Sequence, residues 1–229
     1  MSSTLQTPSA ADAPDPLLAG ERYRAVAQAY DFRTAAGQPY RRQAVQRLAA
    51  RHGETVLDVG CGTGLNFVQL EAALRPAGRL IGIDPTPEML AQARTRAERH
   101  GWTNVELVRA TAEDADIPTN GADAALICGV HDVMRSQSAL ANVLRHLRHG
   151  GRVVAAGAKW APWWQPASAG LNLLTWSVNR DYVTTFEGFD RPWSRLADLL
   201  ADFRVEQVYA GGGYIAAGTW RPALAAPAG

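Results

Sequence analysis

A nine-residue segment, 56–64, restricts the fold of this chain more than any other feature, and it reads VLDVGCGTG. Its apolar first half is typical of a buried central strand in a parallel sheet. Three glycines then alternate with other residues, at Gly60, Gly62 and Gly64, so the backbone can turn sharply and a ligand can lie directly on it. Residues 65–70 predict a helix whose free N–H groups face that ligand. The segment therefore predicts an α/β fold with a binding site where this strand ends.

The spacing of the glycines separates two classes of cofactor. The dinucleotide-binding fingerprint is G-x-G-x-x-G, whereas this turn reads G-x-G-x-G and follows Asp58 by two residues. A carboxylate there suits a ligand with an ammonium group and would repel a pyrophosphate. Asp58 either contacts that ammonium through water or only braces the turn. This spacing argues against a nicotinamide-dependent dehydrogenase.

Short apolar runs predict four more parallel strands after the first. They are residues 79–83, 105–108, 122–128 and 152–156. Between the last two, leucine and valine at helical spacing predict a helix with Leu140 and Leu147 on one face, and Gly150 and Gly151 end it.

The C-terminal part of the chain changes pattern. A helix is predicted over 193–200, followed by strands over 203–209 and 214–220. Three consecutive glycines, 211–213, join these strands as a hairpin. The predicted fold class is α/β, a Rossmann-like doubly wound seven-stranded sheet that is mostly parallel, with an antiparallel C-terminal hairpin strand.

Asp84 ends the predicted second strand, twenty residues after Gly64. An acidic residue at this place can accept hydrogen bonds from both ribose hydroxyls of an adenine nucleoside, although it could instead cap the next helix. Pro85 follows as a further cofactor-binding candidate, and Thr86 is a good N-cap residue. Met89, on the first turn of that helix, could pack against an adenine ring.

Two further turns complete the predicted cofactor site. In the acidic loop 111–118, Glu113 could accept from an exocyclic amine and the backbone of Ala112 could donate to a ring nitrogen. After the fourth strand, Cys128 and Gly129 are expected beside the ligand. Cys61, within the glycine turn, is expected there as well.

Both cysteines, Cys61 and Cys128, are predicted to lie in ligand-facing turns rather than in a disulfide framework. A disulfide between them would crowd the cofactor site. A reducing compartment is the simpler interpretation, so we expect a cytoplasmic protein.

Four segments, in this order, resemble the class I S-adenosylmethionine-dependent methyltransferases. They are VLDVGCGTG (56–64), LIGIDPTPEMLAQAR (80–94), TAEDADIP (111–118) and LRHLRHGGRVV (144–154). The resemblance covers about residues 20–157 and implies S-adenosyl-L-methionine as the cofactor. It implies little about the methyl acceptor.

Within that class, the chain is similar to the ubiquinone/menaquinone C-methyltransferases. In this family an entry segment, matched here by 23–31, closes over the amino-acid end of the cofactor, so the resemblance implies that Tyr23 or Tyr30 binds there. We also count Tyr30 as a catalytic candidate. The loop after the fourth strand departs from the group, because His131 stands where the group has an arginine.

His131 is the sharper catalytic candidate. A methyl on a sulfonium is already activated, so catalysis needs mainly alignment. A base is required only when the acceptor must lose a proton, and an imidazole suits that task near neutral pH. The alternative is a histidine that merely packs or forms a hydrogen bond.

Residues 158–194 hold five of the seven tryptophans of the chain. One interpretation is an aromatic lid or pocket for an apolar acceptor, because ligands of open α/β sheets bind beside the carboxyl ends of the strands. The other is a satellite core that covers the sheet edge, since both need the same residues.

These features predict methyl transfer to O, N or C of an apolar small molecule, such as an aromatic polyketide-like or quinone-like acceptor. A lipid-amine N-methyltransferase is one alternative. Another is a non-methylating S-adenosylmethionine-binding protein, because methyl transfer needs no invariant catalytic residue.

Composition and chain organisation narrow the partners. The net charge is +1 with no long basic run, which argues against nucleic acid. We predict a disordered lead over 1–18 without signal-peptide features, one domain over 19–221 and a flexible tail over 222–229. No metal site, no transmembrane segment and no particular oligomeric state is predicted.

Overall fold

The structure is a computed structural model and describes residues 38–119, 121–181 and 183–222. The predicted lead, almost all of the predicted tail, and both Tyr23 and Tyr30 therefore lie outside the described residues.

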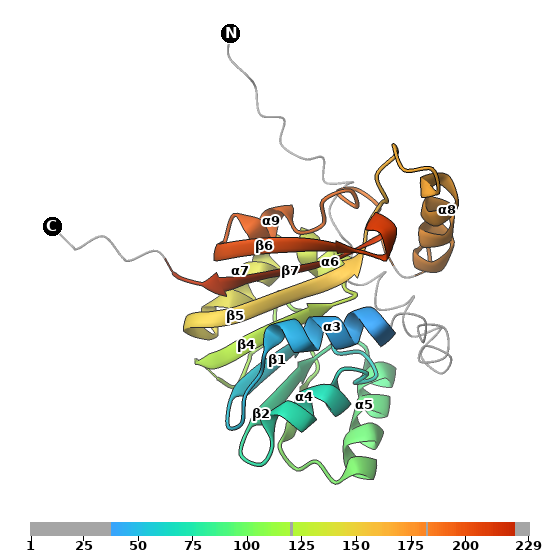
Figure 1. The fold of residues 1–229 in the computed structure, drawn as a ribbon. Coiled ribbons are helices and arrows are strands. Elements are labelled where there is room, and N and C mark those ends of the chain that lie inside the picture. The colour runs from blue at the N-terminus through green and yellow to red at the C-terminus, as the bar shows by residue number, and fades with distance from the viewer. Residues whose placement is uncertain (1–37, 120, 182, 223–229) are drawn as a thin grey trace, which may run out of the picture.

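A seven-stranded sheet with strand order β3-β2-β1-β4-β5-β7-β6 forms the centre of the fold (Figure 1). The strands are β1 Thr55–Val59, β2 Arg79–Ile83, β3 Val105–Val108, β4 Ala122–Cys128, β5 Leu147–Ala158, β6 Leu200–Val208 and β7 Gly213–Trp220. Strands β1 to β5 pair in parallel, and β7 runs antiparallel between β5 and β6. The predicted fold class is confirmed.

Helices cover both faces of the sheet, as the doubly wound prediction requires. The helices are α3 Gln38–Leu48, α4 Phe67–Leu74, α5 Pro87–His100, α6 His131–Arg135, α7 Gln137–Arg145, α8 Ser168–Asn179 and α9 Ser194–Ala197, and a 3-10 turn, η4, spans Tyr209–Gly211. Alternate strand residues point to opposite faces, so Val56 packs in one core with α3, α4 and α5 while Leu57 packs in another with α6, α7 and α9.

The topology fixes where a ligand can bind. The chain adds β2 and β3 on one side of β1 and then returns to place β4 on the other side. The carboxyl ends of β1 and β4 therefore flank the point where the strand order reverses, which is where open α/β sheets hold ligands.

Two predicted helix limits were wrong. Helix α7 ends at Arg145 rather than near Gly150, because Leu147 already pairs with Ala122 of β4 and belongs to the sheet. Helix α9 ends at Ala197, because Leu200 pairs with Trp220 in the C-terminal hairpin. In both places pairing across the sheet overrides a helical pattern that the local sequence supports.

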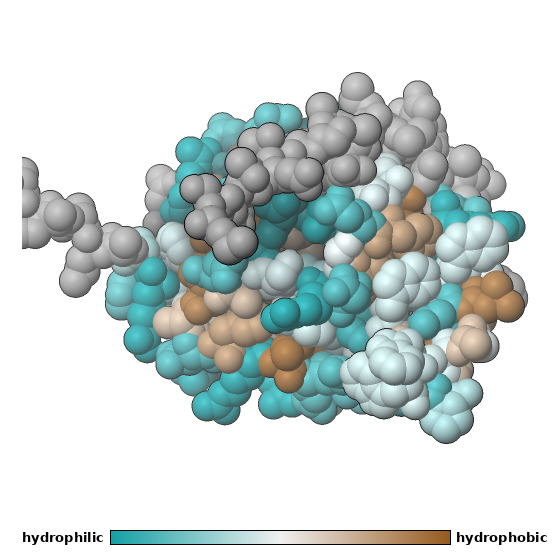
Figure 2. All heavy atoms as spheres, turned by 90° about the horizontal axis from the view of Figure 1, so that it is seen from above, coloured by the Kyte–Doolittle hydropathy of each residue, from teal (hydrophilic) through white to brown (hydrophobic). Residues whose placement is uncertain are grey.

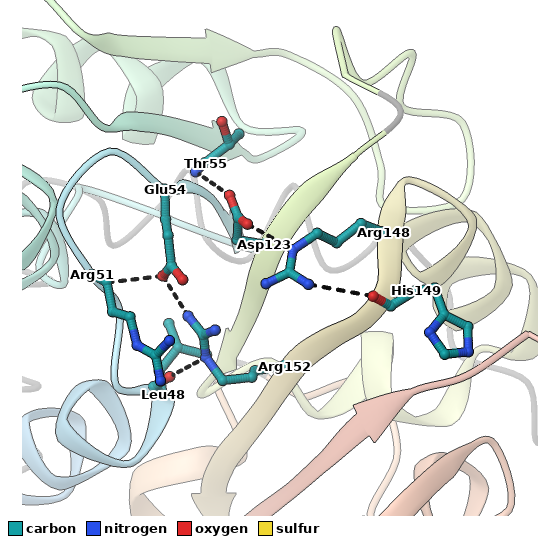
Figure 3. A network of polar contacts seen from close by, with 8 residues as sticks. All are labelled: Leu48, Arg51, Glu54, Thr55, Asp123, Arg148, His149 and Arg152. Atoms are coloured by element: carbon teal, nitrogen blue, oxygen red, sulfur yellow. Dashed lines mark hydrogen bonds and ion pairs between the residues drawn. The ribbon is translucent and has the colours of Figure 1, made fainter.

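The opposite side of the sheet, at the N-terminal end of β1, carries a network of charged side chains (Figure 3). Glu54 forms an ion pair with Arg152 of β5. Asp123 accepts hydrogen bonds from the backbone N–H of Thr55 at 2.8 Å and from Arg148 Nε at 2.7 Å. These contacts tie β1, β4 and β5 together away from the predicted ligand site.

Within the described residues, no helix is both long enough and apolar enough to cross a bilayer. Helix α8, in the middle of the aromatic segment, stands beyond the edge of the sheet in Figure 1 instead of packing along it.

Candidate active site at the carboxyl edge of the sheet

The glycine turn after β1 needs glycine at all three positions. Gly60, Gly62 and Gly64 have φ values of +66°, +56° and +76°, which side chains rarely adopt. A Cβ on Gly60 would lie 2.3 Å from Val130 Cγ1, and one on Gly64 would lie 2.7 Å from Phe67 Cδ2. A Cβ on Gly62 would meet no atom of the described residues within 4 Å. The middle glycine therefore offers the exposed backbone on which a ligand can lie.

Asp84 joins this turn to the beginning of α5. Its Oδ2 accepts a hydrogen bond from the Gly62 N–H at 3.0 Å, and its Oδ1 accepts one from the Thr86 N–H at 2.8 Å. Burial raises the pKa of Asp84, and these two hydrogen bonds oppose that rise. Asp84 thus contacts Thr86, the N-cap residue of α5, in line with the helix-capping role weighed as an alternative, and each oxygen still has lone-pair capacity for a hydroxyl donor.

Asp58 lies beneath the same turn and is completely buried. Asn66 Nδ2 donates to both of its oxygens, at 3.0 and 3.2 Å. Burial raises the pKa of Asp58 to about 7, while the Asn66 hydrogen bond and the positive charge of Arg41 oppose the rise. Sequence reasoning missed Asn66, although an amide at the start of a helix beside a buried acid was a usable signal.

The turn after β4 lies next to the glycine turn, since Val130 packs over Gly60. Gly129 has a φ of +76° and donates its N–H to the Ala156 carbonyl at 2.8 Å. A Cβ on Gly129 would lie 3.2 Å from the Tyr40 hydroxyl. The first turn of α3 therefore reaches the site, a contribution that the sequence analysis did not predict.

The acidic loop is held from α7. Asn142 Nδ2 donates to the carbonyls of Ala112 and Ala115, at 2.9 and 3.0 Å. Ala112 is buried, whereas Glu113 is only half-buried. Asn142 is a further residue that sequence reasoning missed. It lies on the apolar face of a predicted helix, where nothing in the local pattern indicates that its amide binds a distant loop.

The remaining predicted contacts near α5 differ from one another. Met89 is 1% exposed and Pro85 is exposed. Met89 therefore forms part of the interior beneath the site, and a ligand could reach it only if its neighbours move.

Both cysteines, predicted to lie in ligand-facing turns, have buried side chains. Cys61 and Cys128 are buried free thiols that pack in the core on the α3 side of the sheet. Burial raises the pKa of the Cys128 thiol to about 11 and raises that of Cys61 as well. Only their backbone groups remain available to a ligand.

His131 begins α6 directly after the turn that contacts Gly60. Its Nε2 lies 3.1 Å from the Glu187 carbonyl oxygen, and because a carbonyl only accepts, Nε2 carries the proton. Nδ1 is buried without a hydrogen-bond partner among the described residues. Burial lowers the pKa of His131 to about 4, with Arg135 adding to the decrease and the Glu187 hydrogen bond opposing it.

A cluster of aromatic rings from the 158–194 segment lies beside this histidine and contacts it through Phe189. The ring of Phe189 lies 4.5 Å from the imidazole, and Phe189, Phe186 and Trp160 lie 5.0 to 5.2 Å from one another, centroid to centroid. The backbone N–H of Trp160 also donates to the backbone carbonyl of Phe189 at 2.9 Å. We call Trp160, Phe186 and Phe189 the aromatic wall.

A set of polar contacts, which we call the α6 latch, fixes the aromatic wall to the domain. Arg135 Nη2 lies 2.7 Å from Glu187 Oε1, and Thr184 Oγ1 lies 3.1 Å from Asp132 Oδ1. Gly188, at φ +68°, allows the close approach, because a Cβ there would lie 2.5 Å from Arg135 Nη1.

The residues present fit the cofactor that the sequence implied. Gly62 exposes backbone at the end of a parallel strand, Asp84 offers carboxylate lone pairs beside it, and a buried acid lies below. Among the described residues, no cluster of histidine, cysteine and acidic side chains could hold a metal ion.

Comparison with known proteins agrees with this geometry. Residues 56–151 match the family model described as "Methyltransferase domain". The ubiquinone/menaquinone biosynthesis C-methyltransferase of Stutzerimonas stutzeri is 32% identical over 117 residues, which cover 50% of this chain and 46% of that protein. The aklanonic acid methyltransferase of Streptomyces sp. strain C5 is 34% identical over 104 residues, which cover 44% of this chain and 46% of that protein.

A solved structure with a similar fold is the [4+2]-cyclase SpnF, with a TM-score of 0.62, 16% identity, and coverage of 92% of this chain and 97% of that one. The chain spans about half the length of the two curated relatives that it matches. The match to the family model begins in β1, runs through the glycine turn and the acidic loop, and ends within β5. Residues 56–151 of this chain are therefore similar to a methyltransferase domain, in agreement with the resemblance to class I S-adenosylmethionine-dependent methyltransferases.

Proposed function

We propose that this protein transfers the methyl group of S-adenosylmethionine to O, N or C of an apolar small molecule. The observation that supports this acceptor class best is the aromatic wall, which lies against His131 at the carboxyl edge of the sheet. Phe189 itself is 1% exposed, so an aromatic polyketide-like or quinone-like compound would stack against the half-buried rings of Trp160 and Phe186.

Bound S-adenosylmethionine would supply an electrophilic methyl group on a positively charged sulfur. The residues of this chain would then act by binding and alignment. Asp84 would accept from the ribose hydroxyls, the Gly62 backbone would lie under the ligand, and Asp58 would place negative charge below its ammonium. Alignment of this kind lowers the barrier of a displacement reaction by removing the entropic cost of orientation.

His131 would orient the acceptor in this proposal. With a pKa of about 4 its ring is neutral at physiological pH, so Nδ1 carries a lone pair, which an acceptor would reach by displacing the side chains that bury it. A hydroxyl of the acceptor would supply the hydrogen-bond partner that Nδ1 lacks. Only a weakly acidic acceptor would need a base stronger than His131 to take its proton. The role of general base, first predicted from the sequence, stays a prediction, as does a cytoplasmic location.

The names of the two relatives support a small-molecule acceptor, since one is a quinone-pathway C-methyltransferase and the other an aklanonic acid methyltransferase. A second candidate function is a non-methylating reaction that uses the bound cofactor. The cyclase SpnF shares the fold, so fold alone does not distinguish the two.

The first test is calorimetric titration with S-adenosylhomocysteine, with NADH as the control ligand. We expect micromolar binding of the first and none of the second, followed by release of S-adenosylhomocysteine when phenolic or quinol acceptors are supplied with S-adenosylmethionine. Binding without release for phenolic, quinol and lipid-amine acceptors alike would favour the non-methylating function. Binding of NADH alone would contradict the proposal.

A substitution tests the ribose assignment. Asp84→Ala should weaken S-adenosylhomocysteine binding at least about 100-fold, because two hydrogen bonds to a charged group are lost at about 1.5–3 kcal/mol each. Since Asp84 also braces the glycine turn, the control is a cycle with the 2′-deoxy analogue. If the substitution and the deoxy ligand together weaken binding by less than the sum of their separate free-energy losses, Asp84 contacts the ribose directly. If the two losses of binding free energy simply add, the direct contact is contradicted.

A further inference from the structure

Helix α8 presents the reverse of the polarity expected for a surface helix. Most of its inward residues are polar: Ser168 and Thr175 are buried, and Asn172 exchanges hydrogen bonds with the backbone of Ala161 at 2.7 and 3.2 Å. Leu171, which packs on Gly212, is the apolar residue on this side. The large outward side chains of α8 are apolar, and Leu173 and Leu174 are 65% and 57% exposed. Surface helices normally bury their apolar stripe and expose the polar one.

The loop before α8 extends this apolar surface. Trp163 and Trp164 are 85% and 69% exposed. We define the α8 patch as this loop and the outward face of the helix, with the members Trp163, Trp164, Leu173, Leu174, Trp176 and Val178, all exposed. In the view from above, pale and brown side chains gather at the right of the molecule (Figure 2), the side on which Figure 1 places α8.

The charge distribution matches the apolar character of the patch. Helix α8 contains no charged residue, and no aspartate or glutamate occurs between Asp132 and Asp181. At the end of the helix the Arg180 guanidinium lies 4.8 Å from the centroid of the Trp176 ring. Tryptophans flanking an uncharged apolar face, with an arginine at its margin, are typical of residues that lie at the headgroup level of a bilayer.

A protein partner suits the patch less well. A stable protein interface uses about 20–30 residues from each partner and a closely complementary surface, whereas six side chains on a projecting helix and loop form this patch. A projecting apolar tip needs no shaped partner when it enters a lipid interface, because acyl chains adapt to it.

We propose that the α8 patch docks on the surface of a phospholipid bilayer, with its leucines and tryptophans inserted among the headgroups and upper acyl chains. The docking is interfacial, since α8 has only 12 residues. This proposal does not depend on the identity of the methyl acceptor or on turnover.

The test is co-sedimentation of the full chain with phosphatidylcholine vesicles, without and with phosphatidylglycerol. We expect binding to both that persists at high salt, because burial of apolar side chains drives it. Replacing both leucines, Leu173→Gln with Leu174→Gln, should weaken partitioning at least about tenfold. The matched control, Val68→Gln with Val205→Gln, removes apolar residues exposed to 44% and 40% elsewhere and should change it little.

A second measurement begins with the unmodified protein and then uses two conservative substitutions at exposed tryptophans. Bromine-labelled acyl chains should quench the fluorescence of the unmodified protein, and Trp163→Phe with Trp164→Phe should remove most of that quenching. The proposal is overturned if no vesicle is bound, if binding requires phosphatidylglycerol and disappears at high salt, or if the glutamine pair behaves like its control. It is also overturned if the glutamine pair converts a dimer to a monomer in lipid-free ultracentrifugation, which would identify the patch as a contact between two copies.

Discussion

At the scale of single residues, two buried ionisable groups dominate the site and respond to pH in opposite directions. Burial raises the pKa of Asp58 to about 7 and lowers that of His131 to about 4. In both cases a low-polarity environment favours the neutral form. His131 is neutral at physiological pH, whereas Asp58 is close to its pKa there, so an ammonium bound above it would favour the charged form. The two groups contribute to the pH dependence of folding with opposite signs, and each contribution is isolated by removing one group.

Asp58 should make the folded state less stable as pH rises. Its pKa is near 3.8 when unfolded and about 7 when folded, so the folded state binds the proton more tightly and its stability falls between these values, by up to about 4 kcal/mol. Asp58→Asn should gain stability relative to the unmodified protein from pH 4 to pH 7. Urea unfolding across this range measures the difference, and a difference independent of pH would contradict the burial argument.

His131 should show the reverse dependence. Its pKa is near 6.5 when unfolded and about 4 when folded, so its contribution is present above pH 6.5 and is lost as the pH falls towards 4. His131→Gln should therefore gain relative stability on acidification, opposite in sign to Asp58→Asn. Equal slopes for the two variants, measured by the same unfolding series, would refute this assignment.

The same histidine carries the prediction for turnover. If Nδ1 orients or deprotonates the acceptor, His131→Ala should lower kcat roughly 100-fold or more while leaving S-adenosylhomocysteine affinity nearly unchanged. His52→Ala, at an exposed histidine before β1, is the control and should be neutral. Unchanged kcat with a proven acceptor would leave His131 as a packing residue.

At the scale of elements, the α6 latch connects the cofactor side of the site to the aromatic wall. One short helix holds His131 at its beginning and Arg135 at its end, and residues 184–189 attach to both. In the proposed function, the same five-residue helix would therefore position both the acceptor side and the cofactor side of the site. Disturbing the latch should alter acceptor binding more than cofactor binding.

Glu187→Gln tests this directly. The change removes the charge that pairs with the largely buried Arg135 at 2.7 Å but keeps the Glu187 carbonyl that holds His131. We expect KM for the acceptor to rise several-fold with little change in S-adenosylhomocysteine affinity. Glu206→Gln, whose ion pair with Arg47 is exposed, should change neither, and an equal loss of cofactor affinity in Glu187→Gln would contradict the separation.

At the scale of the whole molecule, folding stability and ligand binding lie at opposite edges of one sheet. The network around Glu54 and Arg152 fastens the edge where β1 begins, while the glycine turn and its neighbours occupy the other. This separation lets the binding side hold a turn of left-handed glycines and a buried acid without loosening the strands.

Arg152→Ala should destabilise the fold by about 2–3 kcal/mol, because it removes the hydrogen bond from Nε to the Leu48 carbonyl at 2.9 Å and leaves Glu54, which is 11% exposed, without its cation. Arg47→Ala is the control, since both partners of its ion pair are about half exposed and such pairs contribute under about 1 kcal/mol. Thermal unfolding compares the two, and equal losses would show that the network adds no stability beyond that of surface pairs.

The sequence predicted the seven strands and the fold class, because short apolar runs and the glycine turn mark them, but it did not predict the order of the strands in the sheet. It also predicted Gly60, Gly62, Gly64 and Asp84 at the edge where they lie. It missed Asn66, Asn142 and Tyr40, whose roles depend on contacts between segments far apart in the chain. Local patterns cannot indicate such contacts, and the same limitation explains the helix that was extended to Leu147.

The hydrogen bond from the backbone N–H of Trp160 to the backbone carbonyl of Phe189 has an evolutionary consequence. It closes residues 160–189 into a loop whose two ends are adjacent at the sheet edge, so the whole segment can diverge, shrink or be exchanged between relatives without displacing a strand. In the proposed function, changes in the part of this segment outside the α6 latch would alter acceptor preference while the glycine turn stays in place. The boundaries for a chimeric enzyme are therefore Trp160 and Phe189.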